Sequence, residues 1–277
     1  MTALTTPITR IAPDTLRSAW RVFWYGGRMS YGMLFNWARP SIYIPTLIGG
    51  PTFQLFFFAA LGSYATGRSP AYFAIGNAVQ VSAIAGVFGM TMAIANERWF
   101  GTLPALLATP ANRVAVFAGR FMPFIVNGLI VSLYAFGLGV IFLGVRLAPA
   151  SLGVAGLALL VTVFSCTAIG ALQGAISLRL RDGLFGANLI TMSILLFCGV
   201  NIPLHELPGW MQVIGNLLPF THGLEAVRQA ADGAGLDQVG WLIGVEALVG
   251  IAYAVLAFAL FVYLERSARR NATLDVR

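Results

Sequence analysis

The sequence contains no lysine, because all 17 of its basic residues are arginine. A P-loop of the G-x-x-x-x-G-K-[ST] type is therefore absent, which excludes a Walker-type ATPase, and so is any lysine Schiff-base site. Cysteine and histidine are also scarce, with two of each. Cys166 and Cys198 fall inside apolar runs, away from His205 and His222. The sequence therefore predicts no metal site and no cofactor held by this chain.

Charged residues are few as well. They make up 10% of the 277 residues, against 58% hydrophobic residues, and the mean hydropathy is +0.81. Such values lie outside the range of soluble domains and predict an all-α polytopic membrane protein. The net charge of +7 does not indicate a nucleic-acid partner, because the arginines are scattered at the ends of apolar runs instead of forming a patch.

Apolar runs long enough to cross a bilayer divide the chain into three parts. Residues 1–40 form a tail and a first helix, residues 41–264 hold the spans, and residues 265–277 form a second tail. Fourteen of the 17 arginines fall in segments that share a side with both termini, so the positive-inside rule predicts cytoplasmic termini. The six predicted spans are roughly Ser41–Tyr64, Ala71–Ala95, Phe121–Gly144, Ser151–Leu178, Leu184–Pro203 and Trp241–Leu264.

The part from Thr15 to Arg39 has a different character. Leu16, Trp20, Phe23, Tyr31 and Leu34 recur at helical spacing, and Arg17, Arg21 and Arg28 follow a neighbouring face. An aromatic and arginine-rich helix of this kind is expected to lie in the headgroup plane, next to anionic membrane lipid.

Polar side chains inside the spans are candidates for lining a pathway or bridging helices. For the last of them, Glu246, snorkelling to the outer interface is an open alternative, since it lies close to the predicted start of its span. The candidates are Asn77, Gln80, Asn127, Gln173, Asn188 and Glu246.

The segment 96–120 reads NERWFGTLPALLATPANRVAVFAGR and lies between two apolar runs. Residues 102–109 can form about two helical turns, with Leu103, Leu106 and Leu107 on one face. Composition alone also fits an ordinary cytoplasmic loop with a short surface helix. The pattern E-R-x-x-G-T-L-x-x-L-L-x-T-P is more specific. It resembles the loop between the second and third spans of type-2 ABC exporter permeases, most closely those of the daunorubicin-resistance type.

In that family the segment is the coupling helix, which docks in a cleft of a separate ATPase subunit. The resemblance therefore implies that ATP and Mg²⁺ bind to a partner. This chain departs from the family at Pro104, where a glutamate is usual, and at Trp99 and Phe100, which replace a more charged pair. An acidic contact to the ATPase at that position is thus left open. The matching positions are Glu97, Arg98, Gly101, Thr102, Leu103, Leu106, Leu107, Thr109 and Pro110.

The longest outer segment, 204–240, contains two short apolar stretches separated by Pro219. Thr221 is expected to cap a second helix that runs to about Ala231, and Glu225 could pair with Arg228 three residues later. These features predict a hairpin that dips into the outer leaflet, with a small solvent-exposed loop domain as the alternative. The residues that resemble the outer re-entrant helices of type-2 permeases are Pro208, Trp210, Pro219, Thr221, Glu225 and Arg228.

The resemblance covers most of the chain and implies a bacterial inner-membrane exporter working by alternating access. It would contain two permease subunits, identical or paralogous, and two copies of the ATPase. The apolar spans favour an amphipathic drug or lipid over a polysaccharide as the substrate. Two other classes of membrane protein fit the sequence less well. An intramembrane protease needs serine and histidine at membrane depth, whereas both histidines fall in the outer segment. An ion-coupled transporter would normally carry several acidic groups in its spans, and only Glu246 qualifies.

Overall fold

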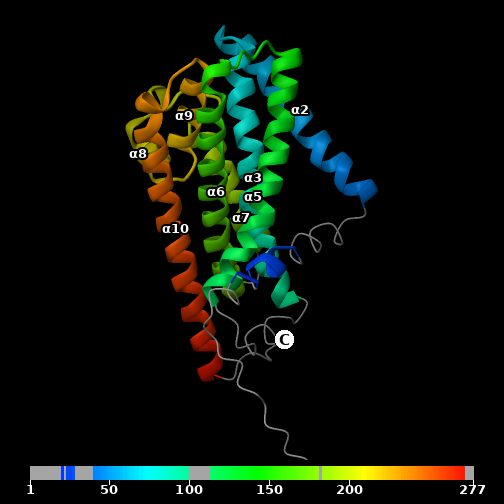
Figure 1. Ribbon diagram of the computed structural model, residues 1–277, viewed down its shortest axis with the longest axis vertical. Coiled ribbons are helices and arrows are strands. Elements are labelled where there is room, and N and C mark those ends of the chain that lie inside the picture. The colour runs from blue at the N-terminus through cyan, green and yellow to red at the C-terminus, as the bar shows by residue number, and fades with distance from the viewer. Residues whose placement is uncertain (1–19, 22, 29–39, 100–112, 181–182, 272–277) are drawn as a thin grey trace, which may run out of the picture.

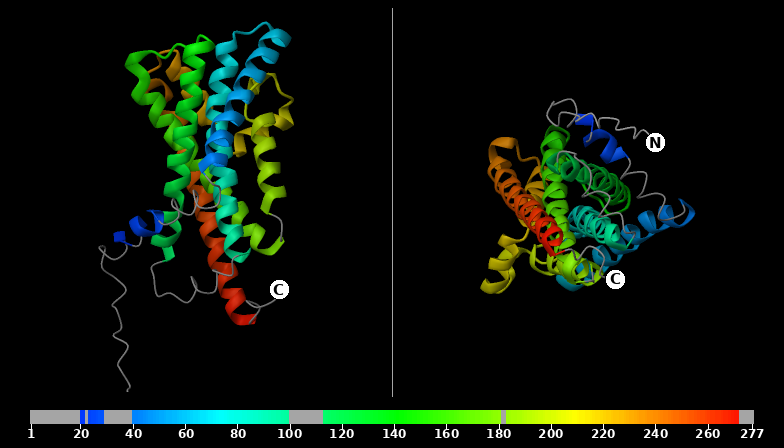
Figure 2. Two further views of the ribbon diagram at one scale, coloured as in Figure 1. Left: turned by 90° about the vertical axis from the view of Figure 1, so that its right-hand side faces the viewer. Right: turned by 90° about the horizontal axis from the view of Figure 1, so that it is seen from below.

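The computed structural model describes residues 20–21, 23–28, 40–99, 113–180 and 183–271, and all regular elements among them are helices. Successive long helices alternate in direction, α2 is inclined to the others, and α3 and α6 lie at the centre (Figure 1; Figure 2). The elements are α2 (Pro40–Thr66), α3 (Pro70–Trp99), α5 (Arg113–Phe142), η1 (Pro149–Ser151), α6 (Leu152–Leu180), α7 (Gly183–Phe197), η2 (Leu204–Glu206), α8 (Gly209–Leu217), α9 (Thr221–Ala231) and α10 (Leu236–Asn271).

Four of the described helices are long and apolar enough to cross a membrane. They include the segments Pro70–Ala95, Val116–Phe142, Pro149–Leu178 and Leu236–Leu264. The helix α2 is not among them, and its sequence is interrupted by Pro45, Pro51 and Gln54. The helix α7 has only 15 residues, or about 22 Å at 1.5 Å per residue, short of a hydrocarbon core of about 30 Å.

Three predicted span boundaries are wrong. The third span was expected to begin at Phe121, but α5 begins at Arg113. The fifth span was expected to reach Pro203, but α7 ends at Phe197 and the chain turns at Gly199, which has a φ of 78°. The last span was expected to begin at Trp241, but α10 begins at Leu236. Asp237 in the first turn of α10 favours this earlier start, because a carboxylate interacts well with a helix N-terminus.

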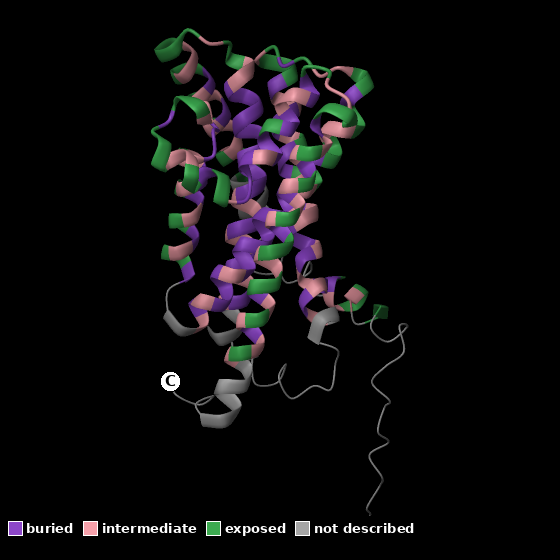
Figure 3. Cartoon of the chain, turned by 90° about the vertical axis from the view of Figure 1, so that its left-hand side faces the viewer, coloured by how far each residue is buried: buried purple, intermediate pink, exposed green. Residues whose placement is uncertain are grey.

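The core lies where α3 and α6 cross. A Cβ atom at Gly170 would stand 2.8 Å from the Val87 Cα atom, so this contact between two backbones requires glycine. At the same crossing, the Thr91 hydroxyl donates a 3.0 Å hydrogen bond to the Gly170 carbonyl. Figure 3 shows the result: buried residues concentrate along the central helices, and exposed residues cover the flanks.

A short helix formed by residues 20–28, of which residue 22 is not described, lies across the lower part of the bundle (Figure 1). The rings of Trp20 and Phe23 stack with centroids 5.6 Å apart, while Arg21 and Arg28 are exposed. This confirms a helix within the predicted stretch Thr15–Arg39. The predicted face positions Leu16, Tyr31 and Leu34, and Arg17 beside them, lie outside the described residues.

Candidate functional site

The segment after α7 forms the two short helices that the sequence predicted. Pro208 precedes α8, and its carbonyl accepts the backbone N–H groups of Met211 and Gln212. Pro219 separates α8 from α9, and α9 ends at Ala231 before Gly233, whose φ is 104°. Figure 1 shows both helices beside the upper part of α6 and α10. We call α8, α9 and their connection the hairpin.

The predicted capping role of Thr221 is wrong. Phe220 occupies the N-cap position of α9, and no side chain of the cap residue itself bonds to the helix. Thr221 is the first helical residue, and its hydroxyl donates a 2.6 Å hydrogen bond to the Gly215 carbonyl in α8. Thr221 thus joins the two helices of the hairpin instead of capping one of them.

The cap of α9 comes from another helix. Glu246 of α10 is completely buried, and its Oε1 atom accepts the Phe220 backbone N–H at 2.7 Å. Its Oε2 atom accepts the Gly223 N–H at 3.1 Å. The Ser165 hydroxyl of α6 also donates to Oε1. A carboxylate at a helix N-terminus both satisfies free N–H groups and interacts with the helix dipole. The alternative that Glu246 snorkels to the interface is therefore wrong.

The backbone at the start of α9 is strained and tightly packed. Phe220 has a φ of 124°, which is rare for a residue with a side chain and costs on the order of 1–3 kcal/mol. Its ring is fully buried, so burial of apolar surface offsets this cost. At Gly223 any Cβ atom would collide with the Thr162 hydroxyl of α6. Together these features hold the start of α9 against α6 and α10.

Arg228 anchors the other end of α9. Its Nη1 and Nη2 atoms each donate a 2.8 Å hydrogen bond, to the carbonyls of Gly199 and Val200. The guanidinium carbon lies 4.0 Å from the centroid of the Tyr72 ring of α3, within the range of a cation–π interaction. At Gly76 a Cβ atom would stand 2.8 Å from Nη2 and would collide with the Val200 carbonyl. Arg228 thus ties together α9, the turn after α7, and α3.

The structure does not show the predicted pair of Glu225 and Arg228. The exposed Glu225 carboxylate instead accepts a 2.9 Å hydrogen bond from Gln229 Nε2. The reason is that the Arg228 side chain turns inward to the turn carbonyls. Burial lowers the pKa of Arg228, and the negative charge of Glu225 opposes that shift. An arginine nevertheless stays protonated in proteins, so a buried cation is held by carbonyl oxygens and a ring.

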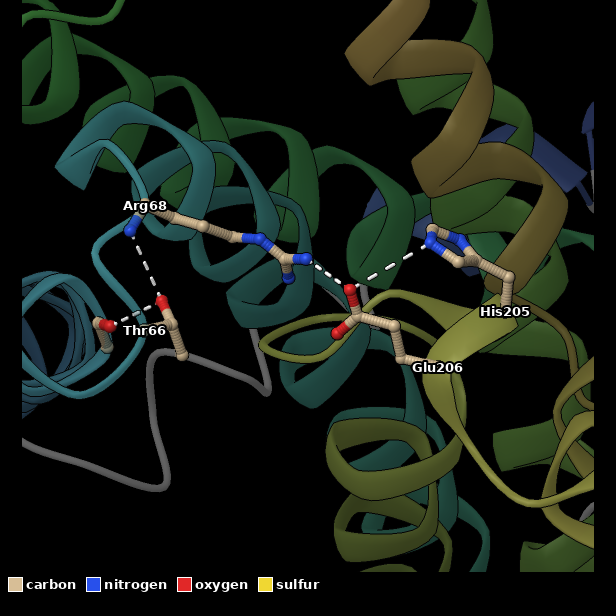
Figure 4. Close-up of polar contacts among 5 residues, drawn as sticks. Thr66, Arg68, His205 and Glu206 are labelled. Carbon is tan, nitrogen blue, oxygen red and sulfur yellow. Dashed lines mark hydrogen bonds and ion pairs between the residues drawn. The ribbon is translucent and has the colours of Figure 1, made fainter.

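A third connection lies on the surface, and the sequence did not predict it. Figure 4 shows Arg68, in the turn between α2 and α3, reaching Glu206 of η2 in an ion pair. His205 lies 3.9 Å from the same carboxylate oxygen, and the Thr66 hydroxyl accepts the Arg68 backbone N–H at 3.3 Å. The Arg68 and Glu206 side chains are partly exposed, so this pair contributes little to stability.

The predicted polar candidates within the spans gather only in part. Asn77 and Gln80 of α3 both accept hydrogen bonds from Gln54 Nε2 of α2, in the case of Asn77 at 3.1 Å. The Asn77 Nδ2 atom donates in turn to Asn201 Oδ1 at 2.9 Å. This amide chain links α2, α3 and the turn after α7. Sequence reasoning missed Gln54, although it is the single amide side chain in the first apolar run.

In the part of the chain that the structure describes, no hydrogen bond joins Gln173 or Asn188 to these amides. Asn127 is buried on α5. Gln173 is buried on α6 and lies against Gly186 of α7. Asn188 is exposed and bonds to the Leu184 carbonyl of its own helix. The hydrogen bonds therefore join Asn77 and Gln80 to the missed Gln54 and Asn201, and no three His, Cys, Asp or Glu side chains meet within the described ranges.

The predicted coupling segment lies largely outside the described residues. Glu97 and Arg98 belong to the last turn of α3, of which only the backbone is described. The remaining predicted coupling positions, Gly101, Thr102, Leu103, Leu106, Leu107, Thr109 and Pro110, all lie outside the description.

An all-helical bundle with several membrane-crossing helices and a short hairpin at one end defines a multi-pass membrane protein. Residues 29–231 match the family model of the ABC-2 type transporter. The chain therefore belongs to the ABC-2 type transporter family and is the membrane subunit of an ABC exporter, a class that works with an ABC ATPase. The match includes α9 but ends before α10, which carries Glu246.

A known relative is similar in sequence over most of its length. The probable doxorubicin resistance ABC transporter permease protein DrrC of Mycobacterium tuberculosis, strain CDC 1551 / Oshkosh, is 24% identical over 241 residues. The alignment covers 80% of this chain and 84% of the relative. The protein of the same name from strain ATCC 25618 / H37Rv gives the same identity and coverage.

Proposed function

We propose that this chain moves an amphipathic drug or a lipid-like molecule outward across a bacterial inner membrane. In this proposal it has six spans, with α2 and the short α7 added to the four apolar helices, and both termini face the cytoplasm. The name of the doxorubicin-resistance relative and the scarcity of charge in the spans support this substrate class. The family match supports the mechanism.

The observation that carries the proposal is the anchored hairpin. It is tied to α10 through Glu246 and to α3 through Arg228. A shift of α10 must therefore move it or break a buried hydrogen bond, and a shift of α3 must move it or break the contact between Arg228 and the Tyr72 ring. In the proposed orientation it lies at the outer end of the pathway, as a re-entrant gate. Segment 96–120 begins in the last turn of α3, at the end of that helix away from the hairpin (Figure 1), and would receive the movement of the ATPase.

In this scheme the energy of ATP hydrolysis reaches this chain through its contact with the ATPase. Two permease subunits, identical or paralogous, would work with two ATPase copies, which bind ATP and Mg²⁺. This chain itself would not hydrolyse ATP, since it has no lysine for a P-loop. Closure of the ATPase dimer would bias the helices towards the outward-open state, as in other two-state transitions. The three donors that surround Glu246 also count against an ion-coupled mechanism, because they occupy its oxygens.

The test is ATP-dependent uptake of doxorubicin into inverted membrane vesicles. The chain is co-expressed with the ATPase encoded by the neighbouring gene, and vesicles with a Walker-A lysine variant of that ATPase serve as the control. We expect uptake that requires both ATP and the intact ATPase. Uptake that continues without ATP and collapses with the proton gradient would instead establish ion coupling.

A further inference from the structure

An apolar groove of about 590 Å³ lies between α5, α6 and α10. Its walls include Phe121 of α5, Phe164 of α6 and Phe258 of α10, and Phe23 of the N-terminal helix lies at its edge. All twelve lining residues are apolar. The groove shares no residue with the hairpin or with the amide chain, so the site described above does not account for it.

The aromatic rings of the groove hold one another in place. The centroids of Phe117 and Phe121 are 5.3 Å apart, those of Phe117 and Phe258 are 5.6 Å apart, and those of Phe121 and Phe164 are 5.9 Å apart. These distances fall in the range of favourable aromatic pairs. The groove is therefore a shaped surface made by three helices and not a gap between loose side chains.

The N-terminal helix is fixed at the groove by a close backbone contact with α5. A Cβ atom at Gly27 would stand 3.1 Å from the Gly119 carbonyl oxygen, and a Cβ atom at Gly119 would stand 2.8 Å from the Phe23 carbonyl oxygen. Two glycines thus allow the helix to rest on α5. The same helix carries the exposed Arg21 and Arg28. The pair of cations thus lies on the same short helix whose Phe23 lines the groove.

We propose that this groove holds an acyl chain of an anionic membrane phospholipid, whose headgroup binds Arg21 and Arg28. The cations match the charge of the phosphate, and the apolar walls match the chain. Sites for drug-sized ligands contain a few polar groups that fix orientation, whereas this lining has none. The groove opens on the flank of α10, where Ile251 and Val255 are exposed, so a lipid enters it from the bilayer.

The lipid completes the contact between the N-terminal helix and the bundle. Its chain bridges Phe23 and the faces of α5 and α10, while its headgroup stays at the level of the arginines. The helix then rests on lipid as well as on α5, so its position depends on the anionic lipid content of that leaflet. This binding is independent of the transported substrate and of the ATPase.

The test uses the full-length permease with its ATPase, reconstituted in phosphatidylcholine vesicles that contain phosphatidylglycerol. After mild detergent extraction, the retained phosphatidylglycerol is measured by mass spectrometry. Ala254→Trp fills the groove, and Leu248→Trp is the matched control, since Leu248 is exposed on the same helix and does not line the groove. We expect Ala254→Trp to reduce retention by about tenfold, equivalent to about two methylenes of lost burial. The control should retain the wild-type amount.

A second variant keeps the groove intact and removes the charges. Arg21→Gln with Arg28→Gln should retain lipid but lose the preference for phosphatidylglycerol over phosphatidylcholine. Equal retention by wild type and Ala254→Trp would overturn the proposal. So would displacement of the retained lipid by doxorubicin, which would make the groove a substrate site. A disulfide between two Val255→Cys chains in the absence of bound lipid would make it an interface between two copies.

Discussion

Glu246 of α10 accepts the backbone N–H of Phe220 at 2.7 Å, so the last helix of the chain caps the N-terminus of α9. A cap contributed by a distant helix makes the hairpin part of the bundle. Movement of α10 along its axis cannot leave α9 unaffected, because the carboxylate is buried and has no water to replace its donors.

Removal of this carboxylate should destabilise the protein. Glu246→Ala leaves the N–H groups of Phe220 and Gly223 buried without an acceptor, at a cost of about 2–3 kcal/mol. Glu246→Gln keeps one acceptor oxygen and should lose less. Thermal unfolding of the purified complex measures both, and Glu225→Ala, exposed on α9, is the control expected within about 0.5 kcal/mol of wild type. A wild-type midpoint for Glu246→Ala would contradict the cap.

The packing around Arg228 can be tested without touching the arginine. Gly76→Ala places a methyl group against the Val200 carbonyl and Arg228 Nη2, so it should displace the turn and reduce transport. Gly137→Ala is the matched change, because nothing lies within 4 Å of a Cβ atom there. It should keep wild-type transport and gain stability slightly, since alanine is the better helix former. ATPase binding should be unchanged in both. Equal transport by the two variants would refute the close contact at Gly76.

Glu225 and Arg228 should act independently of each other. Arg228→Ala loses two hydrogen bonds to carbonyls and a ring contact, whereas Glu225→Ala loses one exposed hydrogen bond. In a double-mutant cycle scored by thermal unfolding, we expect a coupling energy below about 0.5 kcal/mol. A coupling well above that value would restore the ion pair expected from the sequence.

The predicted coupling helix can be tested through its leucines. Leu103→Ser with Leu107→Ser should weaken ATPase docking well beyond tenfold, because each leucine buried in a partner's cleft is worth about 1.5–3 kcal/mol. Co-purification and substrate-stimulated ATPase activity measure the effect in a variant whose membrane insertion is shown to be normal. Arg113→Ala should weaken docking to the ATPase less, because we expect Arg113 nearer the solvated rim of that contact. Unchanged stimulation in the double variant would reduce the segment to a simple loop.

The orientation in the membrane can be tested by cysteine labelling. Both native cysteines, Cys166 and Cys198, are buried, so they should react little with the reagent and give a low background of labelling. In intact cells an impermeant maleimide should label His205→Cys, whose position is strongly exposed next to the hairpin, and should not label Asn112→Cys. After lysis both should react. The reverse pattern in intact cells would invert the proposed topology.

Local signals in the sequence predicted the elements of the hairpin well. Pro208 and Pro219 mark the start of α8 and the break before α9, and Gly233 follows the end of α9. These residues act through their own backbone, so they can be recognised without knowledge of the fold. Gln54 was missed for a different reason, since a single amide in an apolar run shows nothing about its partner.

The anchors of the hairpin could not be predicted from the sequence. Glu246 and Arg228 bond to backbone groups 23 to 29 residues away. Every residue carries the same backbone groups, so the sequence does not show which of them a distant side chain will reach. Thr221 shows how a local rule fails. Its hydroxyl could have capped α9, but the buried carboxylate of Glu246 accepts the Gly223 N–H that this hydroxyl would have taken.

The distance in sequence between α9 and its cap has a consequence for biosynthesis. Glu246 follows Phe220 by 26 residues, so α9 is synthesised and leaves the ribosome before its acceptor leaves it. The hairpin therefore reaches its final fold only when α10 has been inserted into the membrane, and it is the last part of the protein to fold. Released chains truncated after residue 240 should expose the hairpin to protease, whereas released chains that extend past residue 264 should protect it. Equal protection at both lengths would show that the hairpin folds without its cap.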